Sequence, residues 1–211
     1  MPWARKLRVE EAAAQAALEE YIIEVEHQSE RIKRIEDRLT ELSADLGPEM
    51  KAMIKALEGF KGIKFVTAVT IVSEIGDMMR FANAPELMSY SGLVPREYSS
   101  GDKVRKGAIT KSGNAHLRRV LGETAWSYSR GSARPGPTVK KRREGLSPKI
   151  LQIQERADLR LRNRFRQPEA QGKPRNKVIT AVARELLGFI WDAGRTAQKE
   201  AELNSATSPD K

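Results

Sequence analysis

Residues 65–75 have the sequence FVTAVTIVSEI, and whether they form a strand or a helix decides the fold class. β-Branched residues are frequent in this segment, and propensity alone would allow a strand. Its apolar side chains nevertheless recur at intervals of three and four, which is the period of a helix face. They are Phe65, Ala68, Val69, Val72 and Ile75. We therefore predict a helix here and, because no other segment predicts a strand, an all-α fold.

A second, short helix is predicted just before this one. It comprises residues 49–58, and a turn with two glycines joins the pair. This arrangement resembles a helix-hairpin-helix, in which turn amides and a helix N-terminus hold a DNA phosphate. Lys61 and Lys64 stand where that element usually has a proline and its second glycine. The segment is therefore either a phosphate-binding element that uses both lysines or an ordinary helical hairpin.

The N-terminal part of the chain predicts one long helix over residues 8–46. Its apolar residues follow three-and-four spacing while Glu and Arg occupy the other faces, as in a coiled coil. Gly47 and Pro48 end it. Because the apolar stripe is one-sided, it needs a partner, either another helix of the chain or a second copy. We expect a homo-oligomer formed through this coiled coil.

Four further helices are predicted, at residues 85–91, 115–130, 150–166 and 176–193. Two glycine-containing basic segments lie between them, a loop at 96–113 and a linker at 131–149. The predicted organisation is a coiled-coil linker helix (1–47), a compact helical domain (48–194) and a disordered tail (195–211). The linker and the helix after it form a basic region, 131–166.

The charge of the chain is concentrated in one block. The chain has 211 residues with Lys+Arg 38, Asp+Glu 28 and a net charge of +10. Residues 96–185 contain 23 Lys/Arg and 8 Asp/Glu, a net of +15, and the rest contains 15 and 20, a net of −5. A polyphosphate partner explains this segregation, because each cation near a phosphate releases a counterion. We predict a DNA- or RNA-binding protein of the cytoplasm with no membrane partner.

Twelve basic residues are predicted to contact DNA or RNA. They are Lys61, Lys64, Arg96, Lys103, Arg105, Lys106, Lys111, Arg118, Arg119, Arg156, Arg160 and Arg164. The chain has no cysteine and 2 histidines, which excludes disulfides, thiol catalysis and a His-rich metal centre. The remaining candidate for chemistry is the Ser99-Ser100-Gly101 turn, where a hydroxyl could attack a phosphodiester beside clustered cations. Without an evident base, these serines could equally be ordinary loop residues.

Short motifs in a fixed order carry a family resemblance. They are LEGFKG (57–62), TA (67–68), SEIGD (73–77), RF (80–81), YSGLVP (90–95), YSSG (98–101), GAITKSGN (107–114), LRR (117–119), GK (172–173) and AREL (183–186). Residues 57–130 thereby resemble the C-terminal transposase domain of the Piv/MooV-type DNA invertases and related insertion-sequence transposases. Many of these enzymes are guided by a bridge RNA.

The resemblance implies that Ser99 or Ser100 attacks DNA and forms a covalent phosphoserine link. It further implies oligomers around DNA and a RuvC-like DEDD domain whose four carboxylates bind magnesium. We expect that RuvC-like domain to be absent, and therefore no cofactor in this chain, with magnesium only where the domain is supplied. The function is then a DNA transposase or site-specific recombinase domain. The alternatives are a non-catalytic nucleic-acid-binding and dimerisation remnant, or a coiled-coil protein with an incidental basic face.

Overall fold

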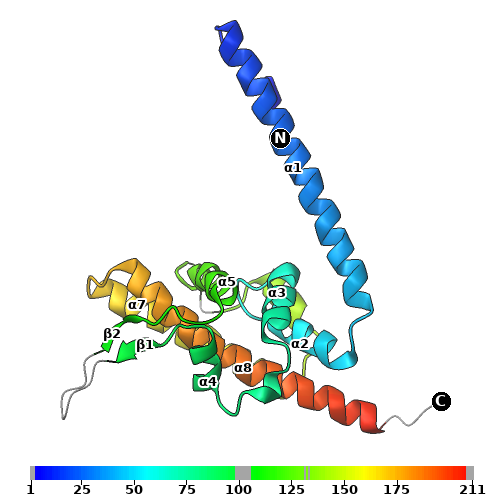
Figure 1. Ribbon diagram of the computed structural model, residues 1–211, viewed down its shortest axis with the longest axis vertical. Coiled ribbons are helices and arrows are strands. Elements are labelled where there is room, and N and C mark those ends of the chain that lie inside the picture. Colours follow the sequence, from blue (N-terminus) through cyan, green and yellow to red (C-terminus); the bar gives the residue numbers. More distant parts are fainter. Residues whose placement is uncertain (1–2, 98–105, 131, 133, 208–211) are drawn as a thin grey trace. The chain divides into compact units, whose positions relative to one another are not determined.

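A computed structural model describes residues 3–97, 106–130, 132 and 134–207. The described residues form eight α-helices and one small two-stranded sheet, which confirms the all-α prediction. The chain divides into two compact units, residues 1–46 and 47–211 (Figure 1). None of the described helices combines the length and the apolar character that crossing a membrane requires.

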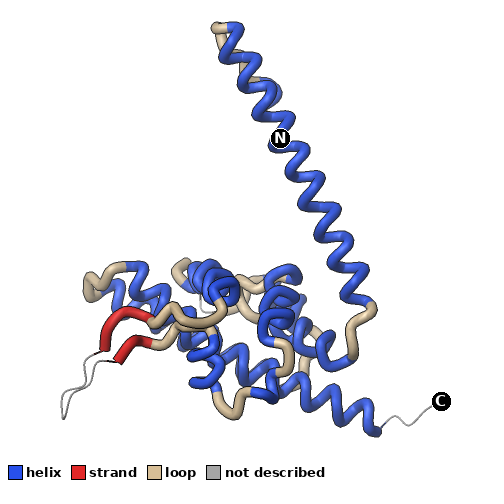
Figure 2. Tube along the Cα trace, viewed as in Figure 1, coloured by secondary structure: helices blue, strands red, loops and turns tan. Residues whose placement is uncertain are grey.

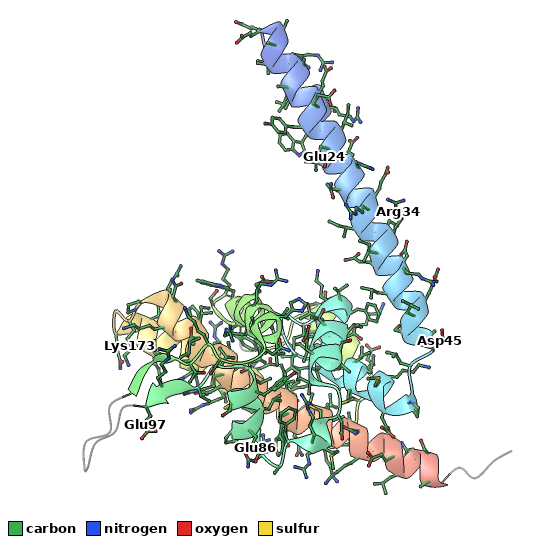
Figure 3. All side chains as sticks on the ribbon, viewed as in Figure 1. Glu24, Arg34, Asp45, Glu86, Glu97 and Lys173 are labelled. Atoms are coloured by element: carbon green, nitrogen blue, oxygen red, sulfur yellow. The ribbon has the colours of Figure 1, made fainter. Side chains whose placement is uncertain are left out.

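The N-terminal unit is dominated by α1 (Ala12–Ala44), which confirms the long helix. The helix begins at Ala12 rather than at residue 8, and Ala4–Lys6 form a separate 3₁₀ turn that packs back on it. Ala4 and Ile22 are buried, and Arg5 forms an ion pair with Glu26. Polar side chains project along the rest of α1 (Figure 3). Several large apolar residues of α1 are exposed: Tyr21, Ile23, Val25, Ile32, Ile35 and Leu42.

The second unit is built around α8 (Arg175–Thr207). Four helices pack on α8: α2 (Pro48–Glu58), α4 (Ala84–Tyr90), α5 (Ala115–Ala125) and α7 (Pro148–Ala170) (Figure 1). Such a central helix must be apolar on more than one side. Two of its rows are buried, Val178, Val182, Leu186 and Ile190 on one and Ile179, Ala183 and Leu187 on the other.

α8 extends beyond the end predicted for it, so the expected disordered tail from residue 195 is wrong as far as Thr207. Contacts with residues 77 and 78 hold the extension in place, although its composition is polar. Gln198 is buried, where its Oε1 accepts from Met78 N at 3.2 Å and its Nε2 donates to Asp77 Oδ1 at 2.8 Å. Gly194 admits Met78, because a Cβ there would lie 2.8 Å from the Met78 Cε.

The basic linker also contains regular structure, α6 (Pro137–Arg143), where no helix was predicted. Arg143 is buried and pairs with Asp158 Oδ2 at 2.6 Å, while its Nε donates to Gly59 O at 2.9 Å. The segment therefore packs through hydrogen bonds and an ion pair. Hydrophobic periodicity cannot reveal packing of this kind.

The predicted helical hairpin of residues 48–75 is confirmed, with α2 followed by α3 (Phe65–Ile75). Its turn is packed into the unit: Phe60 and Ile63 are fully buried. Gly62 has φ +84°, and a Cβ there would lie 2.5 Å from Ser127 Oγ. The tight turn thus serves close packing, and its use as a phosphate-binding element stays a prediction.

The predicted loop 96–113 contains two short strands, β1 (Pro95–Glu97) and β2 (Lys106–Ile109), so the expectation of no strand is wrong here (Figure 2). They pair antiparallel, Pro95 with Ile109 and Glu97 with Lys106, with one bulge between the pairs. Strands this short carry too few residues for a periodic signal.

Candidate nucleic-acid interface

The base of the β1–β2 hairpin is locked to the end of α4 by backbone hydrogen bonds. Lys111 N donates to Gly92 O at 3.2 Å, and Asn114 N donates to Tyr90 O at 2.9 Å. Gly113 has φ +137°, and a Cβ on it would lie 2.3 Å from Tyr90 O. This contact therefore requires glycine, and the motifs YSGLVP and KSGN form one continuous structure.

Four polar side chains join this base to α3 and α5. Asn114 caps α5 by accepting from Leu117 N at 2.8 Å, and its Nδ2 donates to Glu74 Oε2 at 2.5 Å. His116 Nδ1 lies 2.7 Å from Glu74 Oε1, and the Tyr90 hydroxyl donates to Glu74 O at 3.0 Å. Hydrogen bonds from Asn114 and then from His116 lower the pKa of Glu74. The carboxylate thereby fixes the start of α5 beside the hairpin.

The arginines predicted to contact nucleic acid on α7 are paired with acids of α8. Arg156 lies 3.0 Å from Asp192, and Arg160 and Arg164 lie 2.9 and 2.8 Å from the two oxygens of Glu185. These ion pairs join α7 to α8. They give three of the predicted contacts an acidic partner within the unit.

Three other predicted contacts donate to backbone carbonyls. Lys61 Nζ donates to Arg130 O at 2.8 Å, and burial lowers the pKa of Lys61. Arg96 Nη2 donates to Thr110 O at 3.3 Å across the hairpin, and Arg118 Nη1 donates to Ser91 O at 2.9 Å. Each of these three side chains therefore links two segments of the domain by a hydrogen bond. Arg119 lies 4.0 Å from Glu123 on the same helix, a weak exposed pair.

The remaining predicted site residues divide into two groups. Ser99, Ser100, Lys103 and Arg105 lie outside the described residues, as does the side chain of Lys106. Residues 98–105, which include these serines, Lys103 and Arg105, lie between β1 and β2 in the sequence. Lys64 and Lys111 are exposed and form no ion pair with any described residue.

A groove of about 710 Å³ lies between β2 and the first turns of α8. Figure 3 shows Lys173, in the turn before α8, at the same end of the unit as Glu97 of β1. Three cationic side chains line the groove: Lys111, Lys177 and Arg184. Lys177 and Arg184 were missed in the sequence, although residues 177, 180, 181 and 184 form an i, i+3, i+4, i+7 stripe that predicts one helix face.

A metal site is not among the features of this interface. No group of three or more His, Asp or Glu side chains among the described residues is placed to hold a metal ion. Glu74 and His116 form a pair, and their third neighbour is the amide of Asn114. The described residues therefore do not fit a magnesium centre.

Known proteins similar to this chain are transposases and DNA-inverting proteins. The model of the transposase IS116/IS110/IS902 family matches residues 54–138. A putative transposase, y4qE, of Sinorhizobium fredii is 41% identical over 150 residues, which are 71% of this chain and 38% of that protein. The pilin gene-inverting protein of Moraxella bovis is 26% identical over 189 residues, 87% of this chain and 51% of that protein.

A third relative is the transposase for insertion sequence element IS1111A of Coxiella burnetii. It is 34% identical over 87 residues, 38% of this chain and 24% of that protein. This chain thus spans between about a quarter and a half of the length of these three relatives. The resemblance drawn from the motifs is confirmed at the level of the family. Residues 54–138 accordingly match the transposase domain of the IS116/IS110/IS902 family.

Proposed function

We propose that this chain is the DNA-binding and strand-exchanging part of a transposase or site-specific recombinase. The observation that carries the proposal is the family match over residues 54–138. That range includes the Ser-Gly motif, the hairpin strands on either side of it and the network around Glu74. The names of the relatives, transposase and gene-inverting protein, both refer to rearrangement of DNA.

In this proposal Ser99 or Ser100 is the nucleophile. Its Oγ forms a bond to the phosphorus of a DNA phosphodiester while the bond from phosphorus to one bridging oxygen breaks. The serine loses its proton and the departing DNA oxygen gains one, so the exchange needs no oxidant or reductant. Cations close to the phosphate stabilise the charge that develops on its oxygens.

The family resemblance implies magnesium bound by a RuvC-like domain, which would supply electrostatic stabilisation of the reacting phosphate. Because the described residues form no such site, we assign this chain the nucleophile and the grip on nucleic acid. A guide RNA and assembly through α1 belong to the same proposal. The exposed apolar residues of α1 support the assembly, because they leave a face for a second helix.

The alternative is a nucleic-acid-binding and dimerisation module without chemistry. Two observations favour it, the unpaired cations of the groove and the exposed apolar residues of α1, since both serve binding. The two functions differ in one product, a covalent protein–DNA link.

A denaturing gel separates the two functions. The chain is incubated with labelled element-junction DNA, guide RNA and magnesium, alone and with a RuvC-like domain from a relative added in trans. Ser99→Ala and Ser100→Ala are run beside it, with circular dichroism to check their folding. A serine-dependent adduct supports the transposase function. Salt-sensitive binding without an adduct in either arm supports the binding module.

A further inference from the structure

We propose that the groove between β2 and α8 holds a single strand of nucleic acid, with its phosphates against Lys111, Lys177 and Arg184. The inference deepens the proposed function, on which it rests, by assigning the surface that grips the substrate. Lys177 and Arg184 of α8 were not among the predicted contacts. The proposal assigns phosphate binding to them rather than to the arginines predicted on α7.

The first argument is that the basic residues of the groove have no acidic partner among the described residues. Lys111, Lys177 and Arg184 form no ion pair with any described acid, whereas Arg156, Arg160 and Arg164 each lie within 3.0 Å of one. Cations without an internal partner attract phosphate at full charge. The three cations of the groove therefore carry charge of the segregated block that no described acid neutralises.

The second argument is the backbone of Lys111. Its φ is +56°, and it is the one residue other than glycine with a positive φ in the described chain. A side chain in this left-handed conformation costs about 1 kcal/mol or more, a cost that glycine avoids. This backbone conformation places the Lys111 side chain in the lining of the groove.

The third argument is size and lining. Lys177 and Arg184 are two helical turns apart, about 10 Å along α8, so the two cations can contact different phosphates of one strand. Apolar side chains also line the groove: Leu93, Pro95, Ala108, Ile109 and Ala181. A volume of about 710 Å³ accommodates part of a single strand, whose bases can lie against these apolar side chains.

The experiment measures fluorescence anisotropy of labelled oligonucleotides of one sequence, as single-stranded DNA, single-stranded RNA and duplex DNA, over a range of salt. The groove variant is Lys111→Gln/Lys177→Gln/Arg184→Gln. The control is Arg156→Gln/Arg160→Gln/Arg164→Gln, which removes the same formal charge from the paired arginines. Lys177→Glu alone, at an exposed position, is a second groove variant in case the triple variant unfolds.

The groove variant is expected to bind single strands roughly tenfold or more weakly. Its slope of log Kd against log salt should be smaller by about 2, since each single-strand phosphate contributes about 0.7. The control should keep most of the slope, and duplex binding should change less than single-strand binding. The DNA and RNA arms identify which strand is preferred.

Equal losses in the two triple variants would overturn the inference, because net charge alone would then explain binding. An unchanged groove variant, or an equal loss on duplex, would overturn it and leave the proposed function standing. Failure of the unaltered chain to bind any of the oligonucleotides would overturn both. The results thus separate failure of the groove from failure of the function.

Discussion

Arg184 and Glu185 are neighbours on α8, yet Glu185 binds two arginines of α7 while Arg184 lines the groove beside β2. The acid thereby joins two helices, and the cation has no described acid as a partner. This division separates structural charge from charge that remains available for a phosphate. It also supports assigning the proposed phosphate contacts to Arg184 rather than to the paired arginines of α7.

The buried ion pair between Arg143 and Asp158 should be important for stability. Their side chains are 8% and 5% exposed. Asp158→Asn leaves a buried guanidinium without its carboxylate, which should lower the free energy of unfolding by about 3–5 kcal/mol. Asp192→Asn, at the exposed pair with Arg156, is the matched control and should cost about 0–1 kcal/mol. Urea denaturation measures both, and similar small losses would contradict the assigned role.

The turn between α2 and α3 should tolerate no side chain at Gly62. Its φ is +84°, and a Cβ would lie 2.5 Å from Ser127 Oγ. Gly62→Ala should therefore lower the unfolding free energy by more than about 1 kcal/mol. Gly122, inside α5, has no atom within 4 Å of an added Cβ. Gly122→Ala should raise stability by about 0.5–1 kcal/mol, and a loss at this position comparable to that at Gly62 would refute the packing argument.

The network at Glu74 should make the hairpin base sensitive to acid. Because hydrogen bonds lower the pKa of Glu74 from 4.5, its contribution to stability is complete above that pH and is lost as the pH falls through the lower folded value. The unaltered chain should exceed Glu74→Gln in stability at neutral pH, and the difference should shrink in acid. Denaturation of both proteins across this range tests it. A difference that stays constant with pH would exclude ionised Glu74 as the cause.

The exposed apolar residues of α1 should bring copies of the chain together. Ile35→Lys/Leu42→Lys places charges on residues that are 52% and 50% exposed. The variant should sediment as a smaller species than the unaltered chain, because charges at coiled-coil core positions oppose pairing. Thr40→Lys, at an exposed polar position on another side of α1, is the control. Identical sedimentation of the unaltered chain and the double variant would exclude this face as the interface.

The helices whose apolar residues recur every three or four positions could be predicted from the sequence, because this spacing places them on one buried face. α2 and α3 match their predicted ranges to within one residue, whereas α5 begins where predicted but ends at Ala125, before a 3₁₀ turn at Trp126–Tyr128. The parts that were missed are held by polar contacts between residues far apart in the chain. α6 depends on Arg143 with Asp158, and the end of α8 on Gln198 with Asp77. Propensity and periodicity carry no information on such pairs.

The candidate site was predictable in part. The family motifs YSGLVP and GAITKSGN lie at the hairpin base, where only glycine permits the close backbone contact found at Gly113. The choice among basic residues was not predictable, because whether an arginine is available depends on the acids that face it. Arg160 and Glu185 are 25 positions apart in the sequence, and only the packing of α7 on α8 reveals that they form a pair.

The central claim is that a serine of the hairpin segment forms a bond to DNA, and the most direct measurement is peptide mapping of the trapped adduct by mass spectrometry. The chain is incubated with junction DNA, guide RNA, magnesium and a RuvC-like domain in trans, then digested with protease and nuclease. The account predicts a nucleotide remnant on the peptide that contains Ser99 and Ser100, lost from the variant that lacks the reacting serine. A remnant on any other residue, or no adduct from a chain that binds this DNA, would contradict it.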